Sequence, residues 1–119
     1  MPCLFCTLKE NKANYLYENE SWYVLPDKYP ASPGHSLVIL KAHKDSLFEL
    51  DESEWAELQN ALNNAKKKLD ASHEPDAYNI GVNDGKAAGR VIDHLHIHLI
   101  PRYAKAPAKG GIEALLKHS

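Results

Sequence analysis

Short apolar or alternating segments along the chain predict five β-strands. An aromatic and valine-rich segment, interrupted by Glu18-Asn19-Glu20, predicts a β-hairpin within residues 15–25. Residues 35–40 form a mostly apolar run, residues 78–83 alternate weakly, and residues 94–100 begin with a strict alternation. The intervening residues 26–34 and 84–90 contain the prolines and glycines that are typical of loops. We expect Pro101 to end the last strand.

One longer segment changes to the period of a helix. Its apolar residues are spaced by three or four positions: Trp55, Leu58, Leu62, Ala65 and Leu69. This spacing places them on one face of an α-helix, which we expect to run from about residue 52 to residue 70. Asp51 and Glu54 form a capping pattern at its start. Strands on both sides of one long helix predict an α+β fold with a mainly antiparallel five-stranded sheet.

The composition is typical of a single globular domain with nearly balanced charge. The chain has 119 residues, of which 44% are hydrophobic and 25% charged, and its net charge is −2. A charge near zero argues against binding to nucleic acid or to a membrane surface, and no apolar run approaches the length of a membrane span. The first residues lack the pattern of a secretory signal, so we expect a cytoplasmic protein.

Seven histidines are many for a chain of this length, and three of them alternate within five positions. On a strand, His94, His96 and His98 share one face, and the apolar residues between them share the other. We expect the apolar face to pack against the helix. Besides an ordinary polar surface, the histidine face permits two kinds of chemistry: chelation of a metal such as zinc, or nucleophilic catalysis by an imidazole.

The segment from His94 to Ile100 resembles the histidine-triad motif of the HIT family, in which three histidines alternate with apolar residues. Two further segments carry the resemblance: residues 33–43 are similar to a strand of the family, and Cys3-Leu4-Phe5-Cys6 is similar to the start of bacterial members. The chain most resembles the small Hint-like proteins of bacteria and archaea. We therefore expect a HIT-like domain over residues 3–102 and a C-terminal tail over residues 103–119.

The resemblance implies a role for each histidine of the motif. His96 would be the nucleophile that attacks the α-phosphorus of a nucleoside 5′-phosphoryl compound, with a nucleotidyl-histidine as the intermediate. His94 and His98 would stabilise charge that develops on the phosphate, and His35 would support His98. Asp27 would accept hydrogen bonds from the ribose hydroxyls.

The resemblance also implies two groups of nucleotide-binding residues outside the motif. On the phosphate side they are Asn83, Gly85, Gly89 and Arg90, and around a purine base they are Leu4, Phe5, Leu8 and Leu25. Arg90 stands where many relatives carry glutamine, and we expect its guanidinium to bind phosphate through paired hydrogen bonds. The next residue, Val91, has no side-chain group that forms a hydrogen bond.

The only two cysteines are Cys3 and Cys6, and their spacing indicates a metal half-site or a redox pair. The resemblance implies a structural zinc site composed of Cys3, Cys6, His43 and His94, which is a closed tetrahedral set of ligands. A redox pair is disfavoured, because we expect no helix N-terminus after the cysteines to lower the pKa of a thiol.

Together these features predict a HIT-type nucleotidyl hydrolase or transferase without a catalytic metal. Its substrates would be purine nucleoside phosphoramidates or dinucleoside polyphosphates. The resemblance implies a homodimer, with the tail at the interface. Two alternatives remain: a zinc metallohydrolase that uses His94, His96 and His98 around an open metal site, and a nucleotide-binding protein without catalytic activity.

Overall fold

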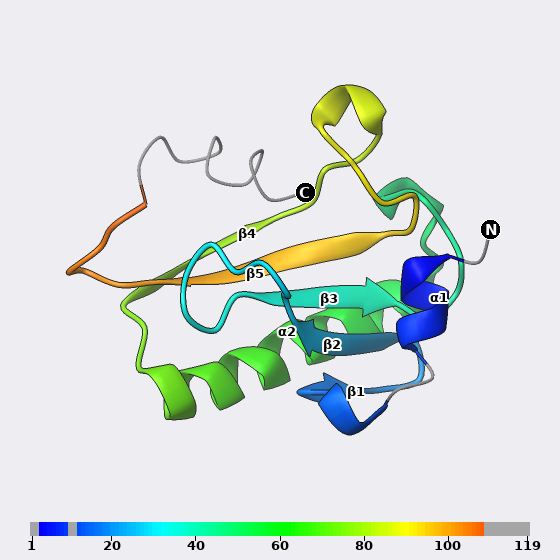
Figure 1. Ribbon diagram of the computed structural model, residues 1–119. Coiled ribbons are helices and arrows are strands. Elements are labelled where there is room, and N and C mark those ends of the chain that lie inside the picture. Colours follow the sequence, from blue (N-terminus) through cyan, green and yellow to red (C-terminus); the bar gives the residue numbers. More distant parts are fainter. Residues whose placement is uncertain (1–2, 10–11, 109–119) are drawn as a thin grey trace.

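The computed structural model describes residues 3–9 and 12–108. Within them, five strands form one antiparallel sheet in the order β1-β2-β3-β5-β4 (Figure 1). The strands are β1 (Tyr17–Glu18), β2 (Trp22–Pro26), β3 (Ser36–Leu40), β4 (Ala77–Gly81) and β5 (His96–Arg102). The described helices are α1 (Leu4–Leu8), α2 (Glu52–His73) and three-residue 3-10 turns at residues 12–14, 47–49 and 86–88. The α+β class, the five-stranded sheet and the single long helix are confirmed.

Helix α2 begins with the predicted capping pattern. The Asp51 side chain accepts a hydrogen bond from the Glu54 amide, and the Glu54 side chain accepts one from the Asp51 amide. Glu54 is buried in the first turn, where its carboxylate also pairs with Lys44 at 2.7 Å. Trp55, which the spacing had placed on the apolar face of the helix, is instead 46% exposed. The helix passes the predicted end and stops at His73, because its left-handed cap is at Glu74, directly before Pro75.

The main hydrophobic core lies between α2 and one face of the sheet. Its buried members are Trp22, Val24, Val38, Leu40, Leu58, Ala61, Ala65, Leu69, Leu95, Ile97 and Leu99. Three of them come from the predicted apolar side of the histidine segment, which therefore packs against the helix as expected. A second cluster of Phe5, Tyr23, Leu25 and Ile39 involves α1 and the alternate residues of β2 and β3.

Strand β5 differs from its predicted bounds at both ends. It begins at His96, so His94 lies in a bend before the strand, and it continues through Pro101 to Arg102. Pro101 is tolerated because β3 begins at Ser36, opposite Leu99, and beyond Leu99 β5 pairs only with β4. The missing N–H of Pro101 therefore costs no hydrogen bond to β3.

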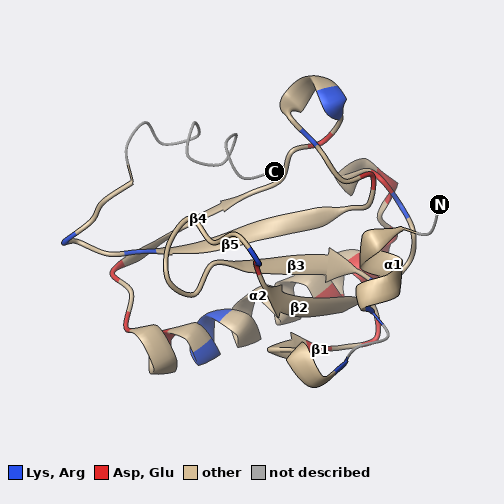
Figure 2. Cartoon of the chain, viewed as in Figure 1, with Lys and Arg blue, Asp and Glu red and all other residues tan. Residues whose placement is uncertain are grey.

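Charged residues are distributed over the loops and α2, with both signs interspersed (Figure 2). The central strand β3 carries no charged residue. Among the described helices, none is long and apolar enough to cross a membrane.

Replacing Leu58 with alanine tests the packing of α2 on the sheet. Leu58 is 6% exposed in the main core, so we expect the free energy of unfolding to fall by about 2–5 kcal/mol. Its exposed neighbour Gln59 is the matched control, and its replacement by alanine is expected to change stability by less than about 0.5 kcal/mol. Urea denaturation measures both. Equal effects of the two substitutions would contradict this packing.

Candidate active site and metal centre

His96 and His98 lie side by side on β5, with ring centroids 5.4 Å apart. Their strand is paired with β3, where Ile39 is opposite His96 and Leu37 is opposite His98. Because side chains alternate along a strand, both imidazoles lie on the sheet face opposite α2. Both are almost completely buried.

The main chain fixes the tautomer of His96. Its Nδ1 lies 2.8 Å from the carbonyl oxygen of His94, and because that oxygen can only accept, Nδ1 carries the proton and donates it. The lone pair of the neutral ring is therefore on Nε2. Burial lowers the pKa of His96 below its usual value, and the hydrogen bond to the His94 carbonyl opposes this only in part. His96 is thus a neutral imidazole with its nucleophilic nitrogen defined.

A chain of hydrogen bonds gives His98 the opposite tautomer. The amide of Ala31 donates to Nδ1 of His35 at 2.9 Å, so the proton of the neutral His35 ring is on Nε2. The Nε2 atom of His35 lies 3.0 Å from Nδ1 of His98 and 3.3 Å from Oδ2 of Asp27. Nδ1 of His98 therefore accepts, and its Nε2 carries a proton that it can donate to a ligand.

A cavity of about 860 Å³ lies beside these histidines. Its lining residues are Leu4, Phe5, Leu8, Asn14, Leu25, Pro26, Asp27, Lys28, Tyr29, Leu37, Val91, Ile92, His96 and His98. The four apolar residues expected around a base and the expected ribose ligand Asp27 are all among them. The sequence did not identify the other lining residues, because nothing in their local pattern distinguishes them from ordinary loop or core positions: Asn14, Pro26, Lys28, Tyr29, Leu37 and Ile92.

The residues expected on the phosphate side do not line this cavity. Asn83, Gly85, Gly89 and Arg90 are absent from its lining. The Arg90 guanidinium instead donates to Oδ1 of Asp93 and to the carbonyl oxygen of Asp45, both at 3.1 Å. The lining of this cavity therefore does not support the expectation that Arg90 binds phosphate: in this structure its side chain holds the loop before β5 against residue 45. The acid three residues later was the signal in the sequence.

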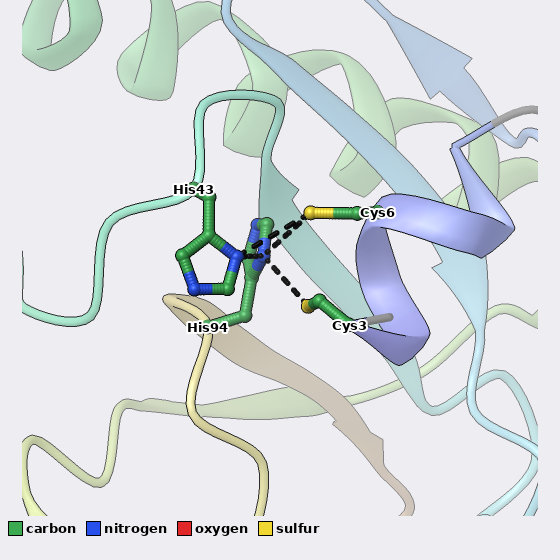
Figure 3. A group of neighbouring side chains, drawn as sticks. All are labelled: Cys3, Cys6, His43 and His94. Atoms are coloured by element: carbon green, nitrogen blue, oxygen red, sulfur yellow. Dashed lines mark hydrogen bonds between the residues drawn. The ribbon is translucent and has the colours of Figure 1, made fainter. Parts of the chain in front are cut away.

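His94 points away from the other two motif histidines. Its Nε2–H donates to the carbonyl oxygen of Leu40 at 2.6 Å, which leaves the lone pair on Nδ1. That nitrogen lies 3.2 Å from Sγ of Cys3, 3.7 Å from Sγ of Cys6 and 3.3 Å from Nδ1 of His43 (Figure 3). Sγ of Cys6 is also 3.4 Å from Nδ1 of His43.

These four side chains fit a tetrahedral metal ion. All four donor atoms lie within 4.8 Å of one another. Zinc bonds of about 2.3 Å to sulfur and about 2.0–2.1 Å to nitrogen require donor atoms about 3.3–3.8 Å apart, which is close to the observed spacings. Nε2 of His43 lies 3.8 Å from Oδ1 of Asp45, so a carboxylate stands behind one of the histidines.

Two alternative chemistries are at odds with this arrangement. In a three-histidine metal site His94, His96 and His98 would converge, but both ring nitrogens of His94 are directed elsewhere, and the metal-binding groups found among the described residues do not combine these three.

The second alternative is a redox pair of Cys3 and Cys6. Contrary to expectation, a helix N-terminus does follow Cys3, because α1 begins at Leu4. Burial nevertheless raises the pKa of the Cys6 thiol, which is the wrong direction for a reactive thiolate.

The comparison with protein families agrees with the motif and the geometry. A sequence model of the HIT domain matches residues 8–105. The chain belongs to the HIT family.

Individual relatives cover most of the chain. A HIT-like protein of Methanocaldococcus jannaschii is 35% identical over 105 residues, which are 85% of this chain and 79% of that protein. An adenylylsulfatase of Arabidopsis thaliana is 35% identical over 119 residues, 98% of this chain but only 60% of that protein. The crystal structure of a zinc-bound histidine triad family protein from Mycobacterium smegmatis aligns with a TM-score of 0.76 at 29% identity, covering 96% of this chain and 88% of that one.

Replacing Arg90 with glutamine tests the observed role of its guanidinium. We expect a loss of about 1 kcal/mol in stability, because Asp93 is half exposed and its pairing is screened by water. We expect the affinity for adenosine monophosphate to change less than about twofold, because Arg90 does not line the cavity. Lys28 does line it, so Lys28→Gln is the comparison variant and is expected to weaken nucleotide binding more. Calorimetric titration measures both affinities. A tenfold loss for Arg90→Gln alone would contradict the placement.

Proposed function

We propose that this HIT protein transfers a nucleotidyl group through His96 and hydrolyses nucleoside 5′-phosphoryl compounds. The observation that carries the proposal is the hydrogen bond from Nδ1 of His96 to the His94 carbonyl, because it leaves a neutral, buried imidazole with its lone pair on Nε2 beside a cavity. HIT proteins are typically nucleotide hydrolases, and a cavity of about 860 Å³ is within the usual size range of small-molecule sites.

The reaction takes two displacements. In the first, Nε2 of His96 forms a bond to the α-phosphorus while the bond to the leaving group breaks and its electron pair departs with that group. Nδ1 of His96 keeps its proton, so the substituted ring is cationic and the His94 carbonyl stabilises it. In the second, water attacks phosphorus, the P–N bond breaks, His96 returns as a neutral imidazole, and one proton is released. Two smaller barriers replace one large barrier.

The remaining residues bind and orient the nucleotide. Nε2–H of His98 would donate to a non-bridging phosphate oxygen. Asp27, whose oxygens already hold the Tyr29 amide and face His35, would use its remaining lone pairs for ribose hydroxyls. Leu4, Phe5, Leu8 and Leu25 would enclose a purine base from α1 and β2.

We infer that the substrates carry a purine nucleoside 5′-phosphoryl group joined to a leaving group, which is an amine, a phosphate chain or another oxyanion. Nucleoside phosphoramidates and dinucleoside polyphosphates meet this description. The name of the Arabidopsis relative adds adenylyl sulfate, in which sulfate is the leaving group. Val91 is 74% exposed at the cavity and offers no side-chain hydrogen bond to a leaving group.

We further propose that Cys3, Cys6, His43 and His94 hold a structural zinc ion. Their spacing and their chemistry support this, as does the zinc-bound Mycobacterium smegmatis relative. When bound, zinc would join α1 to the loops that precede α2 and β5 and would have no open position for substrate. We also propose that the chain works as a homodimer, as its family resemblance implies. Most of the C-terminal tail lies outside the described residues.

Substitution of His96 by asparagine tests the nucleophile. We expect kcat for release of adenosine monophosphate to fall roughly 10³-fold or more, because an amide cannot form the covalent intermediate. His73→Asn, at an exposed position on α2, is the matched control and should retain full turnover. The assay uses adenosine 5′-phosphoramidate, diadenosine polyphosphates and adenylyl sulfate as substrates, and chromatography measures the adenosine monophosphate released. Wild-type rates in His96→Asn would overturn the mechanism, whereas nucleotide binding without turnover of any substrate would favour a non-catalytic binding protein.

A further inference from the structure

Helix α1 belongs to two sites at once. Cys3, immediately before the helix, and Cys6 within it contribute to the metal centre (Figure 3). Leu4, Phe5 and Leu8 line the nucleotide cavity. Within six residues the chain therefore alternates between groups that face a metal ion and groups that face a ligand. Any shift of α1 relative to the sheet displaces both sets of side chains together.

This helix cannot hold its position by itself. It has five residues, far fewer than an isolated helix needs in water. Its anchors on the sheet side are the buried Phe5 ring and a hydrogen bond from the Tyr23 hydroxyl to the Phe5 carbonyl oxygen. At its C-terminal cap, Lys9 donates a hydrogen bond to the Lys41 carbonyl oxygen and accepts one from the Tyr15 hydroxyl. At its N-terminal end, the thiols of Cys3 and Cys6 lie beside His94. A metal ion that binds those thiols would therefore fix a wall of the cavity.

A second connection runs through His94 and reaches the nucleophile. The Nδ1 atom of His94 faces the cysteines, while its carbonyl oxygen accepts the proton of Nδ1 of His96. The Phe5 ring contacts both imidazoles edge to face, with its centroid 5.7 Å from that of His94 and 4.9 Å from that of His96. Phe5 thus lies against a metal-site residue, against the nucleophile and in the cavity wall.

We propose that metal binding at Cys3, Cys6, His43 and His94 is thermodynamically coupled to nucleotide binding in the cavity, through α1 and His94. The inference rests on the proposed function for the identity of the ligand. In this arrangement the four metal-binding side chains and Phe5 are positioning residues. A metal ion that served only the overall stability of the fold would raise the melting temperature without changing the affinity of the folded protein for a nucleotide.

Linkage makes the proposal measurable from both sides. If zinc raises the affinity for adenosine monophosphate by some factor, adenosine monophosphate must raise the affinity for zinc by the same factor. We expect a factor of at least about five, the lower end of typical couplings between sites. The readout is binding, so it does not depend on turnover.

The experiment uses the full chain, stripped of metal and then reloaded with one equivalent of zinc. Titration calorimetry gives the dissociation constant of adenosine monophosphate for both forms, under conditions in which both are folded. Competition with a chromophoric chelator gives the dissociation constant of zinc with and without saturating adenosine monophosphate. We expect tighter nucleotide binding in the zinc form and the same fold-change in zinc affinity.

Two variants of the cavity wall provide the matched comparison. Phe5→Leu keeps all four metal ligands but removes the ring that contacts His94 and His96, so we expect the coupling factor to fall toward one. Lys28→Gln alters the same cavity from the loop after β2 and outside the cluster that contains Phe5, and we expect weaker nucleotide binding with the coupling factor retained. Thr7→Ser, at an exposed position of α1, should behave as the native chain.

The outcomes separate this inference from the proposed function. Zinc binding with equal nucleotide affinities in both forms would overturn the coupling and leave the His96 mechanism standing. Coupled binding without turnover would support the coupling and overturn the mechanism. A chain that binds no zinc overturns the coupling, and a chain that binds no nucleotide overturns both.

Discussion

The hydrogen bond from Nδ1 of His96 to the carbonyl oxygen of His94 is the interaction on which the proposed chemistry of this protein depends. A carbonyl oxygen only accepts, so it assigns the proton to Nδ1 and the lone pair to Nε2 without the help of any side chain. It exists because the chain bends at His94 and enters β5 at His96. The pairing of β5 with β3 and β4 then holds His96 and His98 on the face opposite α2.

The rest of the fold maintains that geometry. The core between α2 and the sheet fixes one face of β5 and of the bend before it, since Leu95, Ile97 and Leu99 are buried there. The opposite face is less strongly fixed, because among the described residues only the five-residue α1 and loops cover it. The Cys and His cluster stands where α1 meets the bend at His94. A zinc ion held there, as we propose, would fasten α1 to the sheet on the side of the cavity.

Much of this could be predicted from the sequence, where the signals are periodic. The alternation at residues 94–100 predicts a strand with an apolar face on the helix, and the spacing from Leu58 to Leu69 predicts that helix. The family followed from the motif. The direction of His94 was not visible in the alternation, because a period of two continues past the point where the backbone bends. Helix α1 was missed because five residues carry no helical period.

Long side chains were harder to place from the sequence. Arg90 was expected at the phosphate, and in the structure its guanidinium reaches Asp93 and the Asp45 carbonyl. Asp93 is a near neighbour in the sequence, but the contact with Asp45 spans 45 positions and cannot be predicted from local pattern. The cavity residues Tyr29 and Val91 come from separate loops, so only the folded chain brings them to the same opening as Leu4. The sequence therefore predicted the elements and the residue types of the site better than their contacts.

The tautomers of the histidines give the most direct test of the account. Long-range proton–nitrogen correlation spectra of the imidazole rings in the full chain, assigned with His96→Asn and His98→Asn, report which nitrogen of each ring is protonated. The account predicts a proton on Nδ1 and a lone pair on Nε2 for His96, and the reverse for His98. A proton on Nε2 of neutral His96 would contradict it, because that ring could not then attack phosphorus.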